Sequence, residues 1–199
     1  MRLRSSGPSP FGRKIKIAAR HLGLMDRIEV IATSTEDPAD PVRSDNPLGK
    51  IPVLILDDGR TVYDSRVILE TLDHMAGGDA IIPKDWDARL AALTLQALAD
   101  GIMDASILVI YEARMRPAEL HHEPWVERQR DKIRRGLAAL QATPPDLGKL
   151  NVGTITTACA LGYLDFRKQV DWRKDYPGLI GWLDAFRAKT GAYDETTPH

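Results

Sequence analysis

The stretch Asn46-Pro-Leu-Gly-Lys-Ile-Pro-Val-Leu54 predicts a loop that leads into a strand. A proline and a glycine break regular structure early in it, and the apolar run from Ile51 to Leu56 is typical of a buried strand. Pro52 lies at the beginning of that run, where a residue without an N–H is tolerated. A proline in a tight turn is a candidate for a cis peptide bond. Such a turn would expose the backbone N–H and C=O of Ile51 to an extended peptide.

Length and composition limit the possible classes of protein. The chain has 199 residues, 43% of them hydrophobic, which suits one large or two small domains, and we expect two. A net charge of -1 provides no broad basic field, so nucleic acid is not expected as a partner. The single cysteine, Cys159, excludes an intrachain disulfide, fits a reducing compartment, and is expected to be buried as a small apolar residue. We find neither the apolar core of a signal peptide nor a run approaching the length of a membrane span, and therefore expect a soluble, cytoplasmic protein.

The first part of the chain predicts the order β-α-β, a connector, and then β-β-α. The connector, from Ala32 to Asp45, is polar and rich in Pro, Asp, Ser and Thr, so we expect an irregular segment or a poor helix. Asp57-Asp58-Gly59 predicts a hairpin turn between the last two strands. The expected strands are 2–5, 28–31, 51–56 and 61–63, and the expected helices are 11–22 and 66–75.

The rest of the chain predicts helices only. Gly77-Gly78-Asp79 indicates a domain boundary, which divides the chain into a domain at 1–77, a linker at 78–84 and an all-helical domain at 85–199. The long first helix begins with Asp85 or Asp87 as a candidate cap. The expected helices of this domain are 85–115, 125–141, 150–166 and 179–189. The residues expected on the buried side of the long helix are Leu90, Leu93, Leu95, Leu98, Ile102, Ala105, Leu108 and Tyr111.

Three short stretches of the first domain are candidates for a functional site: Ser9 to Arg13, Lys50 to Pro52, and Asp64-Ser65. Each is expected where a strand ends or a helix begins, on what could be one edge of the sheet. Ser9 before a proline is typical of a helix N-cap. A hydroxyl can accept an N–H as a cap and still donate its own hydrogen outward, for example to a sulfur. A hydrogen bond and a helix N-terminus can lower the pKa of a thiol from ~8.5 to about 7 or below.

The other two stretches also have both a structural and a functional interpretation. Asp64 and Ser65 are either a helix cap or a binding site for an α-amino acid head group, because a helix N-terminus favours a carboxylate and Asp64 can hold an ammonium group. Lys50 is either solvated or pairs with a second carboxylate. A peptide with a thiol in the middle and a carboxylate at each end would use all three stretches.

These motifs together resemble the cytosolic glutathione transferase superfamily, and the resemblance covers nearly the whole chain. It rests on the serine motif with Arg13, the stretch 49–54, the Asp64-Ser65 pair and the helical remainder, in this order and spacing. Within the remainder, the stretches 100–105 and 160–167 resemble a group of bacterial members, of the serine or cysteine type. The resemblance implies a two-domain fold, α/β plus all-α: a thioredoxin-like domain of order β-α-β-α-β-β-α, followed by the helical domain. It also implies a homodimer that binds glutathione as co-substrate between the two domains.

The resemblance assigns roles to single residues. Ser9 would activate the glutathione thiol, although Ser5 and Ser6, at the end of the first strand where other classes place a tyrosine, are alternatives. The residues that would bind glutathione are Phe11, Lys50, Ile51, Pro52, Asp64, Ser65 and, from the neighbouring subunit, Asp104. Asn151 and Thr154 replace the usual cap of the central helix, Ser or Thr followed by Asp, so we expect a weaker cap there.

Met103, Ile107 and Tyr111 lie at helical spacing on one face of the long helix. Core packing explains such a row, but in the implied architecture this face also lines the cleft above the thiol. We therefore expect these residues to form the hydrophobic substrate pocket, with Tyr111 in contact with substrate.

The expected function is transfer of the glutathione thiolate to small, electrophilic, mostly apolar compounds, as in detoxification. The alternatives are a dimeric binding protein without catalytic activity and a glutathione-dependent reductase or isomerase. No metal is expected, because the adjacent side chains of His121-His122-Glu123 rarely converge on one ion. The basic helix from Trp125 to Arg135 is most simply a solvated face with acid–base pairs.

Overall fold

The computed structural model describes residues 1–198, which fall into two compact units. The first contains Met1–Leu90 together with the C-terminal segment from Thr190, and the second contains Ala91–Lys189. The sequence-based division placed 85–199 in one domain, whereas the structure assigns both ends of that range to the first unit. The start of the long helix is held there by an ion pair between Arg89 and Glu70 at 2.7 Å, and the C-terminal segment is held by α1.

The sheet of the first unit has the strand order β2-β1-β3-β4. Strand β1 (Arg2–Ser5) pairs in parallel with β2 (Glu29–Ala32) and antiparallel with β3 (Val53–Ile55). Strand β4 (Thr61–Val62) then pairs antiparallel with β3 across the predicted hairpin turn. The predicted thioredoxin-like order of elements is confirmed. Strand β3 begins later than expected because Pro52 has no N–H for a ladder bond and stays outside the strand.

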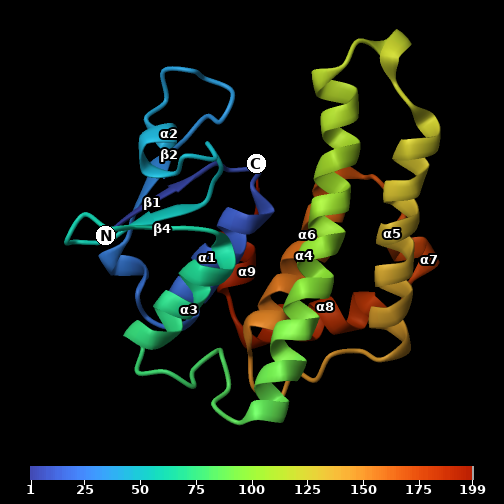
Figure 1. The fold of residues 1–199 in the computed structure, drawn as a ribbon. Helices are drawn as coiled ribbons and strands as arrows, with labels where there is room; N and C mark the ends of the chain where they lie inside the picture. Colours follow the sequence, from blue (N-terminus) through green and yellow to red (C-terminus); the bar gives the residue numbers. More distant parts are fainter. Residues whose placement is uncertain (199) are drawn as a thin grey trace. The chain divides into compact units, whose positions relative to one another are not determined.

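The two main helices of this unit lie side by side against the sheet (Figure 1). Their buried faces and the sheet form a core of side chains without exposed surface, and each large one contributes roughly 1.5–3 kcal/mol relative to exposure. These core residues include Leu3, Ile15, Ile17, Leu54, Ile68, Leu69 and Leu72. The helices of the unit are α1 (Pro10–His21), η1 (Met25–Arg27), α2 (Val42–Asp45), α3 (Ser65–Met75) and α9 (Ala192–Glu195).

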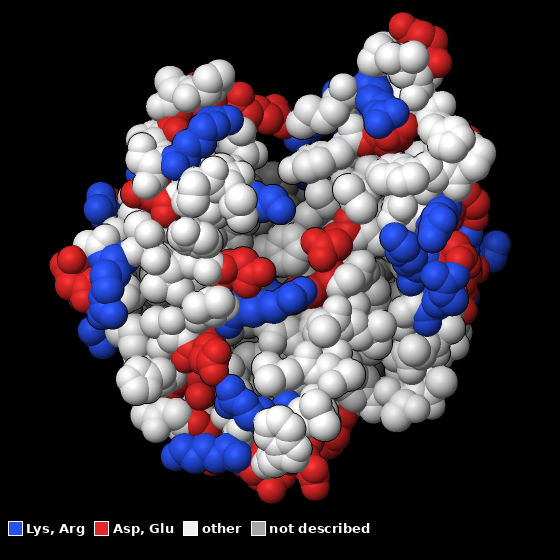
Figure 2. Space-filling view, in the orientation of Figure 1, with Lys and Arg blue, Asp and Glu red and all other residues white. Residues whose placement is uncertain are grey.

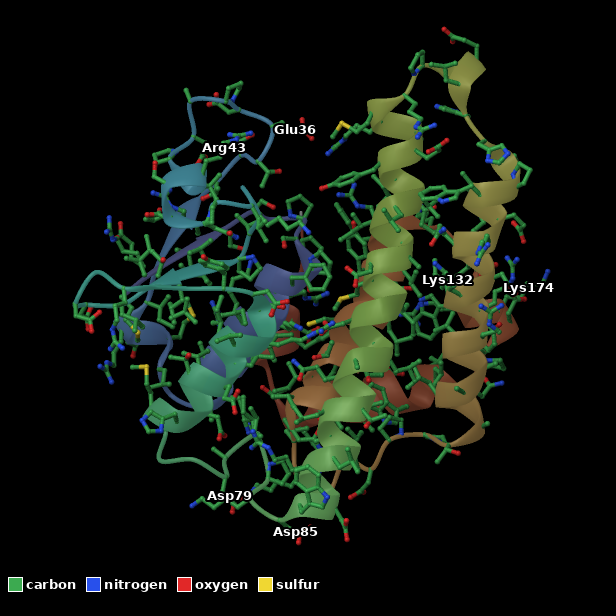
Figure 3. The ribbon with its side chains drawn as sticks, in the orientation of Figure 1. Glu36, Arg43, Asp79, Asp85, Lys132 and Lys174 are labelled. Atoms are coloured by element: carbon green, nitrogen blue, oxygen red, sulfur yellow. The ribbon has the colours of Figure 1, made fainter. Side chains whose placement is uncertain are left out.

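The connector between β2 and β3 is tied to the sheet by charged groups. Arg4 of β1, which is largely buried, forms an ion pair with Asp45. Arg43 donates to two backbone carbonyls of the connector, at 2.8 and 3.2 Å (Figure 3). Asp40 accepts backbone N–H groups from Ser34 and Val42, both at 2.9 Å, and these bonds lower the pKa of its carboxyl. The polar side chains of the connector therefore hold it in place by hydrogen bonds and an ion pair, around the single turn of helix α2.

The second unit is helical, as predicted. Helix α6 is its most buried element, because every residue from Val152 to Leu164 is buried, including Cys159, which confirms the expected location of the cysteine. Its helices are α4 (Trp86–Met115), which begins in the first unit, η2 (Ala118–Leu120), α5 (Glu123–Ala142), α6 (Val152–Arg167), α7 (Trp172–Asp175) and α8 (Gly178–Lys189).

Two helix caps can be compared with expectation. Asp85 accepts the N–H of Ala88 at 2.9 Å and so caps α4, as one of the two predicted candidates (Figure 3). At α6, the Asn151 carboxamide accepts the N–H groups of Gly153 and Thr154, and the Thr154 hydroxyl accepts the N–H of Asn151 at 3.0 Å. This is a complete capping box. The cap expected to be weak thus satisfies the N–H groups that such a cap can reach.

The buried side of α4 agrees with the expected one only in part: Ile102 and Ala105 are buried as predicted. Leu90, Leu93, Leu108 and Tyr111 were predicted to be buried, but they are exposed by 36 to 52%. The buried stripe instead carries polar residues among apolar ones: Gln96, Asp100, Ser106 and Glu112. Because α4 is apolar on more than one side, helical periodicity could not decide which side packs in the core.

By length and composition α4 is also able to cross a membrane, contrary to the expectation that no run approaches that length. In the structure 44% of its apolar window is buried within the protein. Core helices of soluble proteins pass the same test, so this property is weak support for a membrane location.

The basic helix α5 has the expected acid–base pairs. Figure 2 shows Lys and Arg side chains gathered over α5 with acidic side chains among them. Arg130 bonds to Glu123 at 2.6 Å, and Arg134 and Arg135 each form an ion pair with an acidic residue of the same helix. These exposed pairs are worth little individually, and they fit a solvated face.

Candidate functional site

The sheet register brings the three candidate stretches to one edge of the first unit. Strands β1 and β4 both run antiparallel to β3, so the ends of β1 and β4 lie beside the beginning of β3. Helices α1 and α3 begin shortly after these two strand ends. The residue pairs nearest the edge are Arg4 with Val53 and Leu54 with Val62. The stretches at Ser9, Lys50 and Asp64 therefore share one edge, as the sequence predicts.

Ser9 is the N-cap of α1. Its backbone is extended, with φ -72° and ψ 116°, and its Oγ accepts the N–H of Gly12 at 3.1 Å. Pro10 follows at the first helical position. The structural interpretation of this pair is thus confirmed, and the hydroxyl of Ser9, which is partly exposed, keeps its hydrogen for another acceptor.

The two alternative serines have different surroundings. Ser5 is only 1% exposed, and its Oγ lies 2.0 Å from where a Cβ on Gly12 would be. The Ser9 Oγ lies 3.5 Å from the same point, so both hydroxyls adjoin the first turn of α1. Ser6 is partly exposed, and its carbonyl accepts the N–H of Ser9 at 3.2 Å. Burial disfavours Ser5 as a residue that contacts a ligand. Ser9 and Ser6 therefore stay as the candidates for the activating hydroxyl.

The Ile51–Pro52 peptide bond is cis, as predicted. The loop before it is organised by Asn46, a buried residue. Asn46 donates from Nδ2 to the carbonyl oxygen of Lys50 at 2.9 Å, and its Oδ1 accepts the N–H of Leu48 at 3.1 Å. The backbone that carries Ile51 is therefore fixed from the side of the loop.

Asp64 is the N-cap of α3, and its Oδ1 accepts the N–H of Arg66 at 2.9 Å. The peptide bond between Tyr63 and Asp64 is also cis. Asp64 is exposed, whereas Ser65 is buried. The cap interpretation of Asp64 is confirmed, and its carboxylate still has room for a ligand because only one oxygen is engaged by this bond.

Lys50 and Phe11 complete the candidate residues of the first unit. Lys50 is exposed at the loop, next to the carbonyl that Asn46 holds. Phe11 is partly exposed in the first turn of α1, and the ammonium group of Lys14 lies 5.5 Å from its ring centroid. Both side chains thus lie on segments that begin or adjoin the sheet edge.

The candidates on α4 belong to the second unit. Tyr111 is 43% exposed and Ile107 is partly exposed, whereas Met103 has no exposed surface. Asp104 is exposed on the same helix. Of the three predicted pocket residues, Tyr111 and Ile107 are accessible to a small molecule and Met103 is not.

The sequence interpretation missed three residues that shape the site. Asn46 was read as part of a loop, although Asn followed by Pro is a common turn signal whose side chain can bond to nearby backbone. Gly12 was not singled out, although a glycine in the first turn of a helix often marks a close approach. Arg13 was noted only as part of a motif, and no local signal could show that its partners lie near the far end of the chain.

Comparisons with known proteins agree with this geometry. Residues 8–75 match the family model of the glutathione S-transferase N-terminal domain, and residues 123–185 match that of the C-terminal domain. A relative from Escherichia coli (strain K12), described as the uncharacterized GST-like protein YibF, is 37% identical over 185 residues. The alignment covers 90% of each chain.

Solved structures of similar fold contain glutathione. A glutathione transferase family member from Pseudomonas fluorescens Pf-5, with bound glutathione, has a TM-score of 0.91 and 43% identity. The alignment covers 98% of that protein and 100% of this chain. A glutathione S-transferase from Methylobacillus flagellatus KT, also with glutathione bound, has a TM-score of 0.92 and 36% identity, with 99% of it and 100% of this chain covered.

Proposed function

The chain belongs to the glutathione S-transferase family, and we propose that it binds glutathione as co-substrate and transfers its thiolate to small, electrophilic, mostly apolar compounds. The observation that carries this proposal is the position of Ser9, a helix cap with a partly exposed hydroxyl, at the sheet edge that also holds the Lys50 and Asp64 stretches. Relatives of 36 and 43% identity that hold glutathione support it.

Ser9 is the proposed activating residue. Its hydroxyl would donate a hydrogen bond to the glutathione sulfur, and the N-terminus of α1 would add a positive dipole end. Both favour the thiolate, so the thiol loses its proton to solvent near neutral pH. The thiolate then attacks the electrophilic carbon, a C–S bond forms, and the leaving group departs with the electron pair of its own bond.

The remaining contacts would hold the two ends of glutathione. The backbone of Ile51, next to Pro52, would pair with the cysteinyl residue, and Lys50 would bind the glycyl carboxylate. Asp64 and Ser65, at the N-terminus of α3, would bind the γ-glutamyl end. Phe11 lies in the turn that carries Ser9 and would contribute to the same site. Rigid binding of this kind turns the reaction with a second molecule into a positioned one.

Helix α4 offers a surface for a homodimer. Residues spaced three or four apart along it form one exposed face that is mainly apolar. They are Leu90, Leu93, Ala97, Gly101, Asp104, Leu108, Tyr111 and Met115. We propose that this face packs against a second copy of the chain, which would bring Asp104 towards the amino group of the neighbouring glutathione. Leu108→Glu should then give a monomer in sedimentation velocity, whereas a dimer would count against this interface.

The electrophile pocket is proposed at the border of this face, with Tyr111 at the boundary between the dimer face and the pocket. Ile107 and Tyr111 would contact the substrate, and Met103, fully buried, would support them from the core. The identity of the electrophile follows from a screen of standard electrophiles with and without glutathione.

The buried cysteine bears on the alternative of glutathione-dependent reduction. Cys159 is buried in α6 and position 9 is a serine. The proposed site therefore has no cysteine thiol that could form a mixed disulfide with glutathione. Any reduction would run through bound glutathione. A single cysteine also fits the proposed cytoplasmic location.

Calorimetric titration with glutathione, after retention on immobilised glutathione, tests the proposed function directly. Binding by the parent protein is expected, and no binding would refute it. Ser9→Ala should retain most of the affinity but lose turnover at neutral pH, roughly a hundredfold by analogy with loss of one activating donor. Ser6→Ala is the matched control, and if it loses turnover while Ser9→Ala does not, Ser6 is the activating residue.

A further inference from the structure

The side chain of Arg13 leaves α1 and is buried against the C-terminal segment of the same unit, with 3% of its surface exposed. Its Nη2 donates to the carbonyl oxygen of Tyr193 at 2.8 Å and to Oγ1 of Thr197 at 3.4 Å. Its Nε donates to Oγ1 of Thr196 at 3.4 Å, and its Cζ lies 4.1 Å from the centroid of the Tyr193 ring. We call Arg13 and its three partners, Tyr193, Thr196 and Thr197, the C-terminal clasp.

The C-terminal segment is itself ordered to accept these bonds. The hydroxyl of Thr196 donates to the carbonyl of Ala192 at 2.7 Å, which leaves its lone pairs for the guanidinium of Arg13. A second tether, the ion pair of Arg20 with Glu195 at 2.8 Å, joins the same segment to the last turn of α1, at an exposed position. The clasp and the Arg20–Glu195 ion pair therefore attach the C-terminal segment to two different turns of α1.

The clasp acts on the turn that contains Ser9. The N–H of Arg13 donates to the carbonyl of Ser9 at 3.0 Å, and the N–H of Gly12 donates to the Ser9 hydroxyl at 3.1 Å. Arg13 is thus joined to Ser9 through the first backbone hydrogen bond of α1. A displacement of the guanidinium would be transmitted to the hydroxyl over a single helical turn.

A buried cation is a costly way to pack a helix. An apolar side chain of similar volume would fill the same space without the cost of removing a charge from water. The guanidinium instead fixes the orientation of the contact, because its N–H groups lie in one plane and can donate only to acceptors in a narrow range of positions. Ile15 and Ile17, with no exposed surface, already bury the core side of α1, so the clasp is not needed to attach the helix to the sheet.

We propose that Arg13 is a positioning residue for thiol activation: the C-terminal clasp fixes the first turn of α1, and so sets the distance from the Ser9 hydroxyl to the glutathione sulfur. This inference rests on the proposed function. It makes the C-terminal segment, some 180 residues away in sequence from Arg13, part of the glutathione-activating unit.

The test compares Arg13→Met and Arg13→Lys with Arg20→Gln in the full chain. The ultraviolet absorbance of bound thiolate is followed against pH, together with glutathione affinity, kcat and the melting temperature. Arg13→Met should raise the apparent pKa of bound thiol and lower kcat roughly tenfold or more below neutral pH, as misplaced groups do, with little change in glutathione affinity. Arg13→Lys keeps the charge without the planar donors and should lie between. Arg20→Gln, the control, should leave the thiol pKa unchanged.

Three outcomes decide the matter. A folded Arg13→Met variant whose bound thiol titrates like that of the parent overturns the positioning role. If Arg13→Met does not fold, the combined Thr196→Val and Thr197→Val variant removes two acceptors of the clasp. It should shift the thiol pKa in the same direction, and an unchanged pKa overturns the role. Calorimetry on the parent is read first, because absence of glutathione binding there refutes the proposed function itself, and the positioning role with it.

Discussion

Asn46 and Lys50 are joined by a hydrogen bond of 2.9 Å from the Asn46 carboxamide to the Lys50 carbonyl, which closes the loop before the third strand. The same carboxamide accepts the N–H of Leu48 at 3.1 Å, and the N–H of Gly49 bonds to the Asn46 carbonyl at 2.8 Å. One buried side chain thus holds the backbone next to the proposed glutathione contacts.

Asn46→Ala should therefore weaken both stability and glutathione binding. The Lys50 carbonyl and the Leu48 N–H would lose their partner, which costs about 1–3 kcal/mol in a buried setting. We expect a lower melting temperature and roughly a tenfold weaker glutathione affinity by calorimetry. Ser44→Ala, at an exposed position of the neighbouring helix α2, is the control and should change neither. Unchanged affinity in Asn46→Ala would mean that the loop holds its shape without the carboxamide.

Gly12→Ala should disturb the turn that carries Ser9. The new Cβ would lie 2.0 Å from Oγ and 3.1 Å from Cβ of Ser5, so a side chain or the helix must move. Such overpacking costs typically about 1–3 kcal/mol. The cost should be smaller in a Ser5→Ala background, and a double-mutant cycle of chemical denaturation measures the difference. At Gly7 an added Cβ meets nothing within 4 Å, so Gly7→Ala should be nearly neutral. Equal costs in both backgrounds would contradict the proposed clash.

Asp73→Ala should strongly destabilise the first unit. One oxygen of this carboxylate, in a residue 6% exposed, accepts the N–H groups of Ala80, Ile81 and Ile82 at 2.7 to 3.1 Å. Loss of the acceptor leaves these donors unpaired, two of them buried, at a cost of at least about 2 kcal/mol. Thermal and urea unfolding measure it, with Asp87→Ala, at an exposed position, as the control. A loss no larger than that of Asp87→Ala would mean that the turn finds other acceptors.

The connector should lose stability in acid. The pKa of Asp40 is lowered from its ordinary value of 3.8, first by its bonds to backbone N–H groups and then by nearby arginines. A carboxyl whose folded pKa is depressed stabilises the protein above its unfolded pKa, and this contribution is lost as the pH falls through the folded value. The parent should therefore exceed Asp40→Asn in melting temperature near neutral pH, and the difference should shrink below about pH 3.8. A difference that stays constant through this range would show that the charge of Asp40 plays no part.

Much of the first unit could be predicted from neighbouring residues. The order of elements along the chain, the helix caps at Ser9 and Asp64, and the meeting of three stretches at one sheet edge were predicted from short-range patterns. Caps and turns are stabilised mainly by residues close in sequence, so a short stretch of sequence is enough to predict them. The resemblance to glutathione transferases added the family, which the domain matches then confirmed.

The errors arose where the deciding contacts are distant in sequence. Helix α4 is apolar on several sides, and only packing against its neighbours shows that Gln96 and Asp100 are buried while Leu90 and Leu108 are exposed. Contacts distant in sequence also group the segment from Thr190 with the first unit.

The sequence by itself determined the family, the order of elements and the cap that would present a hydroxyl to a thiol, because these depend on residue types at short spacing. Only the tertiary structure decided that Gly12 lies against Ser5, that Asn46 closes the loop at Lys50, and that Arg13 reaches Tyr193. Each of these contacts depends on the direction of one side chain in a folded core. Hydrophobic periodicity carries no information about such directions, since burial depends on area and not on orientation.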